Sequence, residues 1–184
     1  MNVGGIMSIP TTDCIFIQPY DSPCGRLMLG SYSGQLCLCS WVVERHRPNV
    51  EKHLQKMLKA PCKQSTTEVI EAAQRQLDEY FSRKRQSFHI PLLFVGTAFQ
   101  EKVWRALLAI PFGVTVSYAD IARQIGMPKA VRAVANANRA NVISIFVPCH
   151  RVIGSDGSLT GYGGGLPTKN FLLELEAKQG FLFQ

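Results

Sequence analysis

The chain has 184 residues, of which 46% are hydrophobic and 18% charged, so it is long enough and apolar enough to bury a core. This composition excludes an intrinsically disordered chain, and the sequence has no heptad or Gly-X-Y repeat that would indicate a coiled coil or collagen. The net charge of +7 is divided into +3 over residues 1–96 and +4 over residues 97–184, and it is compatible with a polyanionic partner.

Nothing in the sequence indicates a membrane span or secretion. The longest apolar run, 142–149, is far shorter than the roughly 20 residues of a helical span. The N-terminal residues carry no Lys or Arg before their short apolar stretch, which argues against a secretory signal. We therefore expect a cytoplasmic protein whose six cysteines are reduced. Each cysteine is then a buried structural thiol, a metal ligand or a nucleophile.

Residues 1–95 predict a small α/β domain that begins with a β-hairpin. Strand-like stretches at 26–32 and 36–43 flank Ser33 and Gly34. A two-residue loop of this kind suits the tight turn of a hairpin.

A helix is expected to pack against this antiparallel sheet. The polar, Lys-rich segment 44–64 leads to a capping box formed by Ser65 and Glu68. Apolar residues then recur on one helical face, which predicts a helix over about 66–83. Residues 89–96 form a connector.

Residues 96–184 predict a second domain that is mostly helical. A capping box at Thr97 and Gln100 precedes apolar residues at spacings of four, four and three, which indicate an amphipathic helix. A last amphipathic segment carries Glu176.

Two short helices joined by a tight turn predict a helix-turn-helix. Ser117 caps a helix over 118–125, Gly126 ends it, and Pro128 suits the first turn of a helix over about 129–139. One face of the second helix is polar and basic: Lys129, Arg132, Asn136 and Arg139. From the pattern alone, this face fits a solvated surface helix as well as a helix that contacts DNA.

The densest chemistry lies near Cys149, which ends an apolar run and precedes His150. A free thiol has a pKa near 8.5, so a nucleophilic cysteine needs a base. His150 can supply one if a carboxylate orients it, and Glu176 is a candidate for that carboxylate. Neighbours in sequence do not necessarily face each other, so the pattern alone leaves a catalytic pair and a structural coincidence both open.

The motif 148–152, Pro-Cys-His-Arg-Val, resembles the active-site signature of the O6-alkylguanine-DNA alkyltransferases, which repair DNA by direct reversal. The similarity covers nearly all of 97–178 in order and spacing, whereas the first 95 residues match only in general layout. Further matching residues are Phe99-Gln100, Val103-Trp104, Ile110-Pro111, Gly113, Ser117-Tyr118, Ile121-Ala122, Arg132-Ala133-Val134, Thr160-Gly161-Tyr162, Lys169 and Leu172-Leu173. In length the chain resembles the short, stand-alone bacterial type.

The resemblance implies a ribonuclease-H-like sheet with a helix in the first domain and a helix-turn-helix in the second. Such proteins bind duplex DNA from the minor-groove side and flip the damaged base out of the stack, because the target atom is unreachable inside the duplex. They transfer the alkyl group of O6-alkylguanine, and also of O4-alkylthymine, irreversibly to a cysteine. The product is a thioether that no residue here could cleave, so we expect each molecule to act once and be consumed. We expect a monomer without a cofactor.

Carried over residue by residue, the resemblance assigns a role to each catalytic position. Cys149 would attack the alkyl carbon, His150 would act through a water as base, and Glu176 would orient His150. Asn141 would tie the helix-turn-helix to the active site. Tyr118 would turn the DNA backbone and donate a proton toward the leaving guanine.

The resemblance also assigns the DNA contacts and the substrate pocket. Arg132 would be the arginine finger that fills the gap left by the flipped base. The remaining assigned positions are Lys129 and Ser155 on DNA, and Pro148, Val152, Tyr162 and Gly163 around the substrate. Two positions depart from the family pattern: Val142 replaces a proline found in many members, and Gly163 replaces a serine found in some.

Several family members carry zinc in the N-terminal region. The possible ligands here are Cys14, Cys24, Cys37, Cys39, His46, His53 and His89. They lack tight paired-ligand spacing, so we expect no metal. Alternation along the expected strand would point the thiols of Cys37 and Cys39 to the same face, as buried thiols.

Two other functions compete with alkyl transfer. One is a helix-turn-helix regulator or lesion-binding protein without transferase activity; the intact Cys149 argues against the lesion-binding type, in which this cysteine is typically replaced by tryptophan. The other is a cysteine hydrolase that uses Cys149 and His150, which would leave the helix-turn-helix unexplained.

Overall fold

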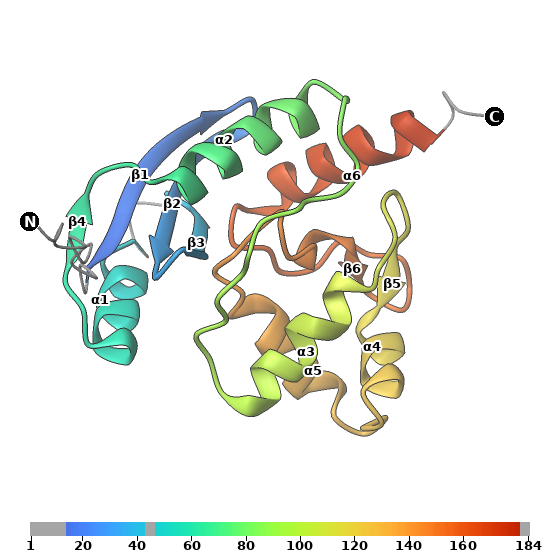
Figure 1. The fold of residues 1–184 in the computed structure, drawn as a ribbon. Helices are drawn as coiled ribbons and strands as arrows, with labels where there is room; N and C mark the ends of the chain where they lie inside the picture. The colour runs from blue at the N-terminus through green and yellow to red at the C-terminus, as the bar shows by residue number, and fades with distance from the viewer. Residues whose placement is uncertain (1–13, 43–46, 181–184) are drawn as a thin grey trace, which may run out of the picture.

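The structure, a computed structural model, describes residues 14–42 and 47–180, so the stretch examined for a secretory signal and His46 lie outside the described residues. The strands are β1 (Ile15–Ser22), β2 (Gly25–Tyr32), β3 (Gln35–Trp41), β4 (Cys62–Gln64), β5 (Val116–Ser117) and β6 (Val152–Ile153). The helices are α1 (Arg47–Leu58), α2 (Glu68–Phe81), α3 (Ala98–Leu108), α4 (Tyr118–Gln124), α5 (Val131–Arg139) and α6 (Leu166–Gly180), with a short 3-10 helix at Cys149–Arg151. Figure 1 shows the sheet on one side of the molecule and α3, α4 and α5 grouped on the other.

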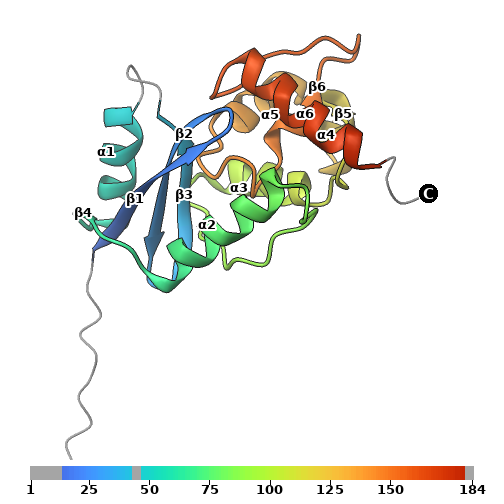
Figure 2. The same ribbon diagram turned by 90° about the horizontal axis from the view of Figure 1, so that it is seen from above.

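Four strands form a mixed sheet in the order β3-β2-β1-β4. Strands β1, β2 and β3 pair antiparallel, and β4 pairs parallel with β1. Ser33 and Gly34 join β2 to β3 with φ angles of 48° and 75°, which confirms the predicted hairpin, because tight hairpin turns need positive φ. Helix α1 covers one face of the sheet and α2 the other (Figure 2). A small mixed sheet with helices is therefore observed in the first half.

A β-bulge changes the direction of one cysteine. The register between β2 and β3 shifts at Gly30 and Ser31, so β3 contains an extra residue there. Cys37 consequently packs in the cluster under α1, whereas Cys39 packs in the main core. The prediction that both thiols face the same side is wrong, because strict alternation holds only in a strand without a bulge.

Two elements occur where the sequence analysis predicted none. Helix α1 lies inside the polar segment 44–64, in which Leu54 is a fully buried apolar residue. Strand β1 was absent from the expected hairpin, although it buries Ile15 and Ile17 on alternate positions. A helix that buries so little of its surface has a weak hydrophobic period, which explains the missed α1.

Helix α2 agrees with its predicted span, but its cap differs. Thr67 caps it: the Thr67 hydroxyl accepts a hydrogen bond from the Ile70 N–H at 3.3 Å. The predicted capping box at Ser65 is therefore wrong, because two adjacent threonines offered better-placed hydroxyls that the sequence pattern did not distinguish.

The capping boxes of α3 and α4 confirm the predicted starts of these helices. Thr97 and Gln100 exchange side-chain-to-backbone bonds at the start of α3. Ser117 and Asp120 do the same at the start of α4. Gly126, with φ +73°, follows the end of α4 in the left-handed conformation that favours glycine.

Helix α5 begins at Val131, two residues later than predicted. Lys129 and Pro128 lie in a turn before it, closed by the bond from the Ala130 N–H to the Met127 carbonyl at 2.8 Å. Lys129 is therefore not part of the polar face of α5. The predicted first-turn role of Pro128 is wrong, because this turn takes the place of the first helical turn.

One hydrophobic cluster joins the two halves of the chain. It includes Leu29 of the sheet, Tyr80 of α2, Leu107 of α3 and Leu172 of α6. The division into domains at residues 95 and 96 stays a prediction.

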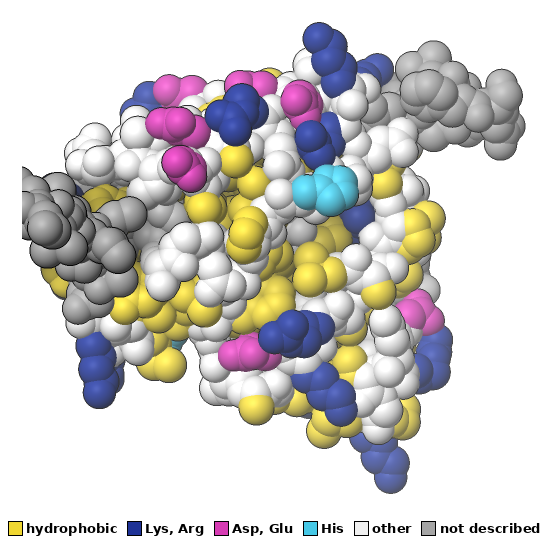
Figure 3. Space-filling view, in the orientation of Figure 1, with side chains coloured by type: hydrophobic (Ala, Val, Ile, Leu, Met, Phe, Trp, Pro, Cys, Tyr) yellow, Lys and Arg dark blue, Asp and Glu magenta, His cyan; other side chains and the backbone are white. Residues whose placement is uncertain are grey.

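Among the described residues, no helix is both long and apolar enough to cross a membrane. Lys and Arg side chains are spread over both parts of the face seen in Figure 3.

Candidate active site

Cys149 follows a buried segment, 143–148, that bends twice. Ile145 has φ +72°, a rare conformation for a β-branched residue. Pro148, with φ −80° and ψ 59°, forms an inverse γ-turn in which the Cys149 N–H donates to the Val147 carbonyl at 2.8 Å. These bends start the 3-10 helix at Cys149 and fix the direction of its side chain.

Two asparagines at the end of α5 hold this segment. Asn141 donates to the Val147 carbonyl at 3.1 Å and accepts from the Ile143 N–H at 2.9 Å. Asn138 donates to the Cys149 carbonyl at 3.3 Å. Asn141 was predicted as a site residue, whereas Asn138 was given no role in the site. The end of α5 is therefore fastened directly to the backbone of Cys149.

The Cys149 thiol is buried and protonated at neutral pH. Burial raises the pKa of the thiol, while a hydrogen bond from Asn141 and the nearby charge of Lys169 lower it in part. Lys169 is itself buried; its ammonium donates to the carbonyls of Val152 at 2.6 Å and Thr160 at 2.8 Å. A thiol in this setting needs a base before it can act as a nucleophile.

His150 is buried and neutral, with a free ring nitrogen. Burial lowers the pKa of His150, against the opposing effect of Glu176. Its Nε2 lies 2.8 Å from Oε1 of Glu176, so in the neutral ring Nε2 carries the proton and donates it to the carboxylate. Nδ1 then holds a lone pair, and it has no hydrogen-bond partner among the described residues. His150 therefore keeps a lone pair on a buried ring nitrogen, at the position that follows Cys149 in the chain.

Glu176, on the buried face of α6, is the centre of a hydrogen-bond network. Its oxygens accept bonds from Tyr80 Oη (2.8 Å), His150 Nε2 (2.8 Å), Arg151 Nε (2.8 Å) and Nη2 (3.1 Å), and the Gly113 N–H (3.1 Å). Burial alone would raise the pKa of Glu176, but the hydrogen bonds from His150 and Arg151 and the positive charge of Arg151 outweigh it and lower the pKa to about 2. Glu176 is therefore ionised at any physiological pH.

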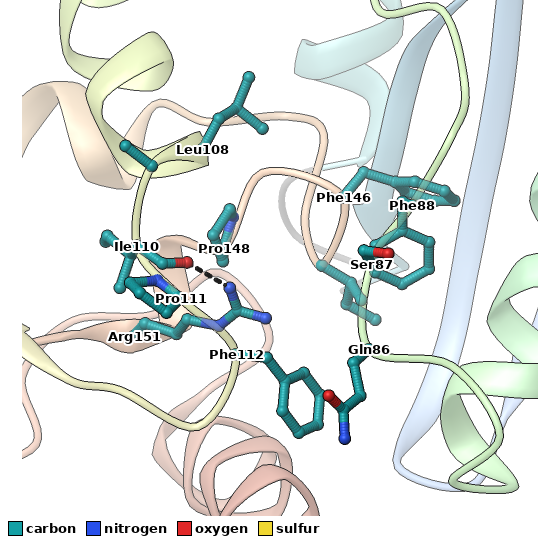
Figure 4. Close-up of a pocket in the computed structure, with 12 residues that line it drawn as sticks. Gln86, Ser87, Phe88, Leu108, Ile110, Pro111, Phe112, Phe146, Pro148 and Arg151 are labelled. Atoms are coloured by element: carbon teal, nitrogen blue, oxygen red, sulfur yellow. Dashed lines mark hydrogen bonds between the residues drawn. The ribbon is translucent and has the colours of Figure 1, made fainter.

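Arg151 supplies the charge that balances Glu176. Its guanidinium also donates to the Ile110 carbonyl at 2.7 Å and lies 5.6 Å from the ring centre of Phe112 (Figure 4). The sequence analysis quoted Arg151 within the motif but gave it no role. The available signal was an arginine inside an otherwise apolar run, because a buried arginine requires a partner of opposite charge.

Tyr80 belongs to α2, far from the motif in sequence, and its phenol is fully buried. The sequence analysis placed it among the apolar residues of that helix. Its hydroxyl donates to Oε1 of Glu176, a residue 96 positions later in the chain. No local pattern distinguishes this role from ordinary packing.

The expected DNA-contacting residues lie on the outside of α4, α5 and the loop after β6. Strands β5 and β6 pair in parallel, which places the start of α4 beside the segment that follows Cys149. The Tyr118 hydroxyl donates to the Thr160 carbonyl at 3.4 Å. Ser155 and Lys129 are exposed. On α5, three polar residues share the exposed face, as predicted: Arg132, Asn136 and Arg139.

The expected pocket residues do not all line the same cavity. Tyr162 and Gly163 line a cavity of about 290 Å³ together with Asn141. Pro148 lines a different cavity of about 280 Å³, on the Arg151 side of the segment (Figure 4). Val152 is fully buried, and its carbonyl receives the Lys169 ammonium.

The N-terminal cysteines and histidines do not form a metal centre in the part of the chain that the structure describes. Within 14–42 and 47–180, no three His, Cys, Asp or Glu side chains come together in a way that could hold a metal ion. All six cysteines are free thiols.

Comparison with known proteins relates this site to a DNA repair family. Residues 98–178 match the family model for the 6-O-methylguanine DNA methyltransferase, DNA binding domain. The chain is 44% identical to the methylated-DNA–protein-cysteine methyltransferase of Mycobacterium leprae over 165 residues, which are 90% of this chain and 94% of that protein. It superposes on the crystal structure of the Mycobacterium tuberculosis O6-methylguanine methyltransferase with a TM-score of 0.77 and 41% identity, covering 90% of this chain and 94% of that one. The structure of Mycobacterium tuberculosis OGT in complex with DNA gives a TM-score of 0.76 at 41% identity, with 89% and 94% covered.

We predict that Glu176→Gln destabilises the protein at neutral pH by about 3 kcal/mol, because it leaves the Arg151 charge buried without a counter-ion. The folded-state pKa of Glu176 is depressed from 4.5 to about 2, so the stability it contributes is complete above pH 4.5 and is lost as the pH falls toward 2. The difference in free energy of unfolding between wild type and variant should therefore be constant above pH 4.5 and shrink below it. Urea unfolding at a series of pH values measures this difference.

Glu101→Gln is the matched control for this experiment. Glu101 pairs with Arg105 at the surface, at 3.7 Å, and such pairs contribute little to stability. Its substitution should change the free energy of unfolding by less than about 1 kcal/mol at every pH. A Glu176→Gln difference that persisted unchanged down to pH 2 would contradict the assignment of Glu176 as the ionised centre.

Proposed function

Because the chain belongs to the methylated-DNA–protein-cysteine methyltransferase family, we propose that it repairs DNA by transferring the alkyl group from O6 of guanine to the sulfur of Cys149. The observation that carries this proposal is the buried His150–Glu176 pair: Glu176 holds the imidazole through Nε2 and leaves Nδ1 unpaired, one position after Cys149 in the chain. We extend the proposal to O4-alkylthymine, which presents the same kind of oxygen-bound alkyl carbon.

The proposed reaction begins with a proton transfer. The Cys149 thiol passes its proton through one water to Nδ1 of His150, and the imidazolium that forms is stabilised by Glu176 at 2.8 Å. Asn141 and Lys169 stabilise the thiolate, since both lower the pKa of Cys149. The thiolate therefore exists only while His150 holds the proton.

The thiolate then attacks the alkyl carbon. A carbon–sulfur bond forms as the carbon–O6 bond breaks, and the electron pair remains on guanine, which takes a proton from the Tyr118 hydroxyl. Thiolate is the best side-chain nucleophile for substitution at saturated carbon. The thioether product has no group nearby to cleave it, so each molecule acts once and is consumed.

The outer helices fit the DNA-binding part of this function. We assign α4, the Gly126 turn and α5 to a helix-turn-helix, and Arg132 on its exposed face to the gap left by a flipped base. Lys129 and Ser155 would contact the DNA backbone from the minor-groove side. The similarity to a protein solved in complex with DNA supports this arrangement.

The remaining parts of the proposal concern organisation. We assign residues 1–95 to a ribonuclease-H-like α/β domain and residues 96–184 to the alkyltransferase domain. The protein would act as a monomer in the cytoplasm, where its free cysteines are kept reduced.

Intact-mass spectrometry after incubation with O6-benzylguanine tests the transfer. We expect each molecule to gain one benzyl group and never a second one, because the acceptor is a single thiol. Cys149→Ala should gain none. Cys39→Ala, which removes another fully buried thiol, is the matched control and should gain one group as the wild type does.

A folded wild type that gained no mass from O6-benzylguanine and none from methylated duplex DNA would overturn the proposal in favour of a binding-only protein. Release of alkyl product over many turnovers would instead indicate a hydrolase.

Arg132→Ala separates base flipping from chemistry. We predict that it slows alkyl transfer from duplex DNA at least about tenfold, because the flipped state loses a contact worth ~1–3 kcal/mol. Transfer from free O6-benzylguanine, which needs no flipping, should keep its rate. Arg105→Ala removes an exposed arginine of α3 and should leave both rates unchanged. Equal loss with both substrates would contradict the role given to Arg132.

A further inference from the structure

Trp41, the last residue of β3, has no role in the mechanism above, yet its side chain reaches the active-site loop. It is only 7% exposed. Its indole N–H donates to the Tyr162 hydroxyl at 3.1 Å, and the two ring centres lie 6.2 Å apart in an edge-to-face arrangement. A residue of the first half of the chain is thus bound to a residue of the proposed substrate pocket.

Three glycines form a slot around this indole. A Cβ added to Gly25, whose φ is +136°, would lie 3.6 Å from the six-membered ring. A Cβ on Gly163 would lie 3.8 Å from the indole. A Cβ on Gly164 would approach three indole atoms to 2.8–2.9 Å, closer than real Cβ contacts allow. Because the glycines have no side chains, the indole has room between them, and their backbones confine it on both sides.

The indole also forms part of a cavity that two residues of the proposed site, Asn141 and Tyr162, line. Trp41, Asn141, Ser144, Tyr162 and Gly163 line the cavity of about 290 Å³. Asn141 holds the backbone of the segment that leads to Cys149, and the Tyr162 ring centre lies 6.4 Å from that of His150. Because Tyr162 and Gly163 are the residues assigned to the substrate, we assign this cavity to the transferred group.

We propose that Trp41 is a specificity-determining residue: its indole is a fixed wall of the alkyl-group pocket, holds Tyr162 in place, and limits the size of the group that is transferred. This inference rests on the proposed function and names a residue of the sheet as part of its substrate site.

The physical reason is that this wall has little freedom to yield. The glycine backbones on either side confine the indole, and its N–H is already engaged by Tyr162, so displacing it costs both packing and a buried hydrogen bond. A methyl group would need no displacement. A larger group would meet the wall, and a difference of even one carbon in such a pocket changes rates by about tenfold or more.

The test compares transfer from two duplex oligonucleotides that differ only in the group on one guanine, methyl or benzyl. The readout is the ratio of the benzyl to the methyl rate constant, in which the fraction of folded protein and the affinity for DNA cancel. We expect the ratio to rise from wild type through Trp41→Phe to Trp41→Leu, by on the order of tenfold in the last.

Trp104→Phe and Trp104→Leu are the matched controls. Trp104 is also buried, donates its N–H to the Ala137 carbonyl at 2.8 Å, and packs over Gly96. It does not line the cavity of about 290 Å³. These variants should leave the ratio at the wild-type value.

A paired substitution keeps the inference testable even if Trp41 variants lose stability. Gly164→Ala alone should slow methyl transfer at least about tenfold, because its methyl group collides with the indole, and Trp41→Leu in the same chain should restore most of the rate. If the two substitutions instead slowed methyl transfer independently, so that the double variant was slower than Gly164→Ala alone, the result would contradict the contact.

The outcomes separate this inference from the function on which it rests. Failure of the wild type to transfer either group would overturn the proposed function and this inference with it. Transfer of both groups, with the same ratio in wild type, Trp41→Phe and Trp41→Leu, would overturn the role of Trp41 alone.

Discussion

The buried carboxylate of Glu176 is the interaction on which the rest of this site depends. A charge without solvent is stable only when hydrogen bonds and an opposite charge surround it. Here the donors come from α2, the loop after α3, and the segment after Cys149, and they converge on α6. Satisfying one carboxylate therefore fixes four parts of the chain relative to one another, and His150 is aligned as one result of that requirement.

Burial keeps both members of the proposed catalytic pair uncharged in the structure. It raises the pKa of Cys149 and lowers that of His150, while Glu176 and Arg151 balance each other's charge. A permanently ionised cysteine would react with other electrophiles and oxidants. In the proposed reaction, the proton moves from Cys149 through one water to Nδ1 of His150. The buried ion pair is already arranged around His150, so this part of the site needs no reorganisation during the transfer.

The first half of the chain contributes to the site more directly than its separation in sequence suggests. Tyr80 of α2 reaches Glu176, and Trp41 of β3 reaches Tyr162. Both side chains belong to the hydrophobic cluster that continues from the sheet into the helices. The sheet therefore supports the proposed catalytic pair from one side and, as we propose, shapes the substrate pocket from another.

Local sequence patterns were enough to predict the hairpin at Ser33-Gly34, the caps at Thr97 and Ser117, and the motif that carries Cys149 and His150. These depend on turn chemistry, short-range hydrogen bonds and residues that are neighbours in the chain. Contacts between distant segments, in contrast, set the start of α5, the reversal of Cys37 by a bulge, and the partners of Arg151, Tyr80 and Trp41. Each of these arises where distant segments compete for the same space or the same buried charge, and no local pattern contains that information.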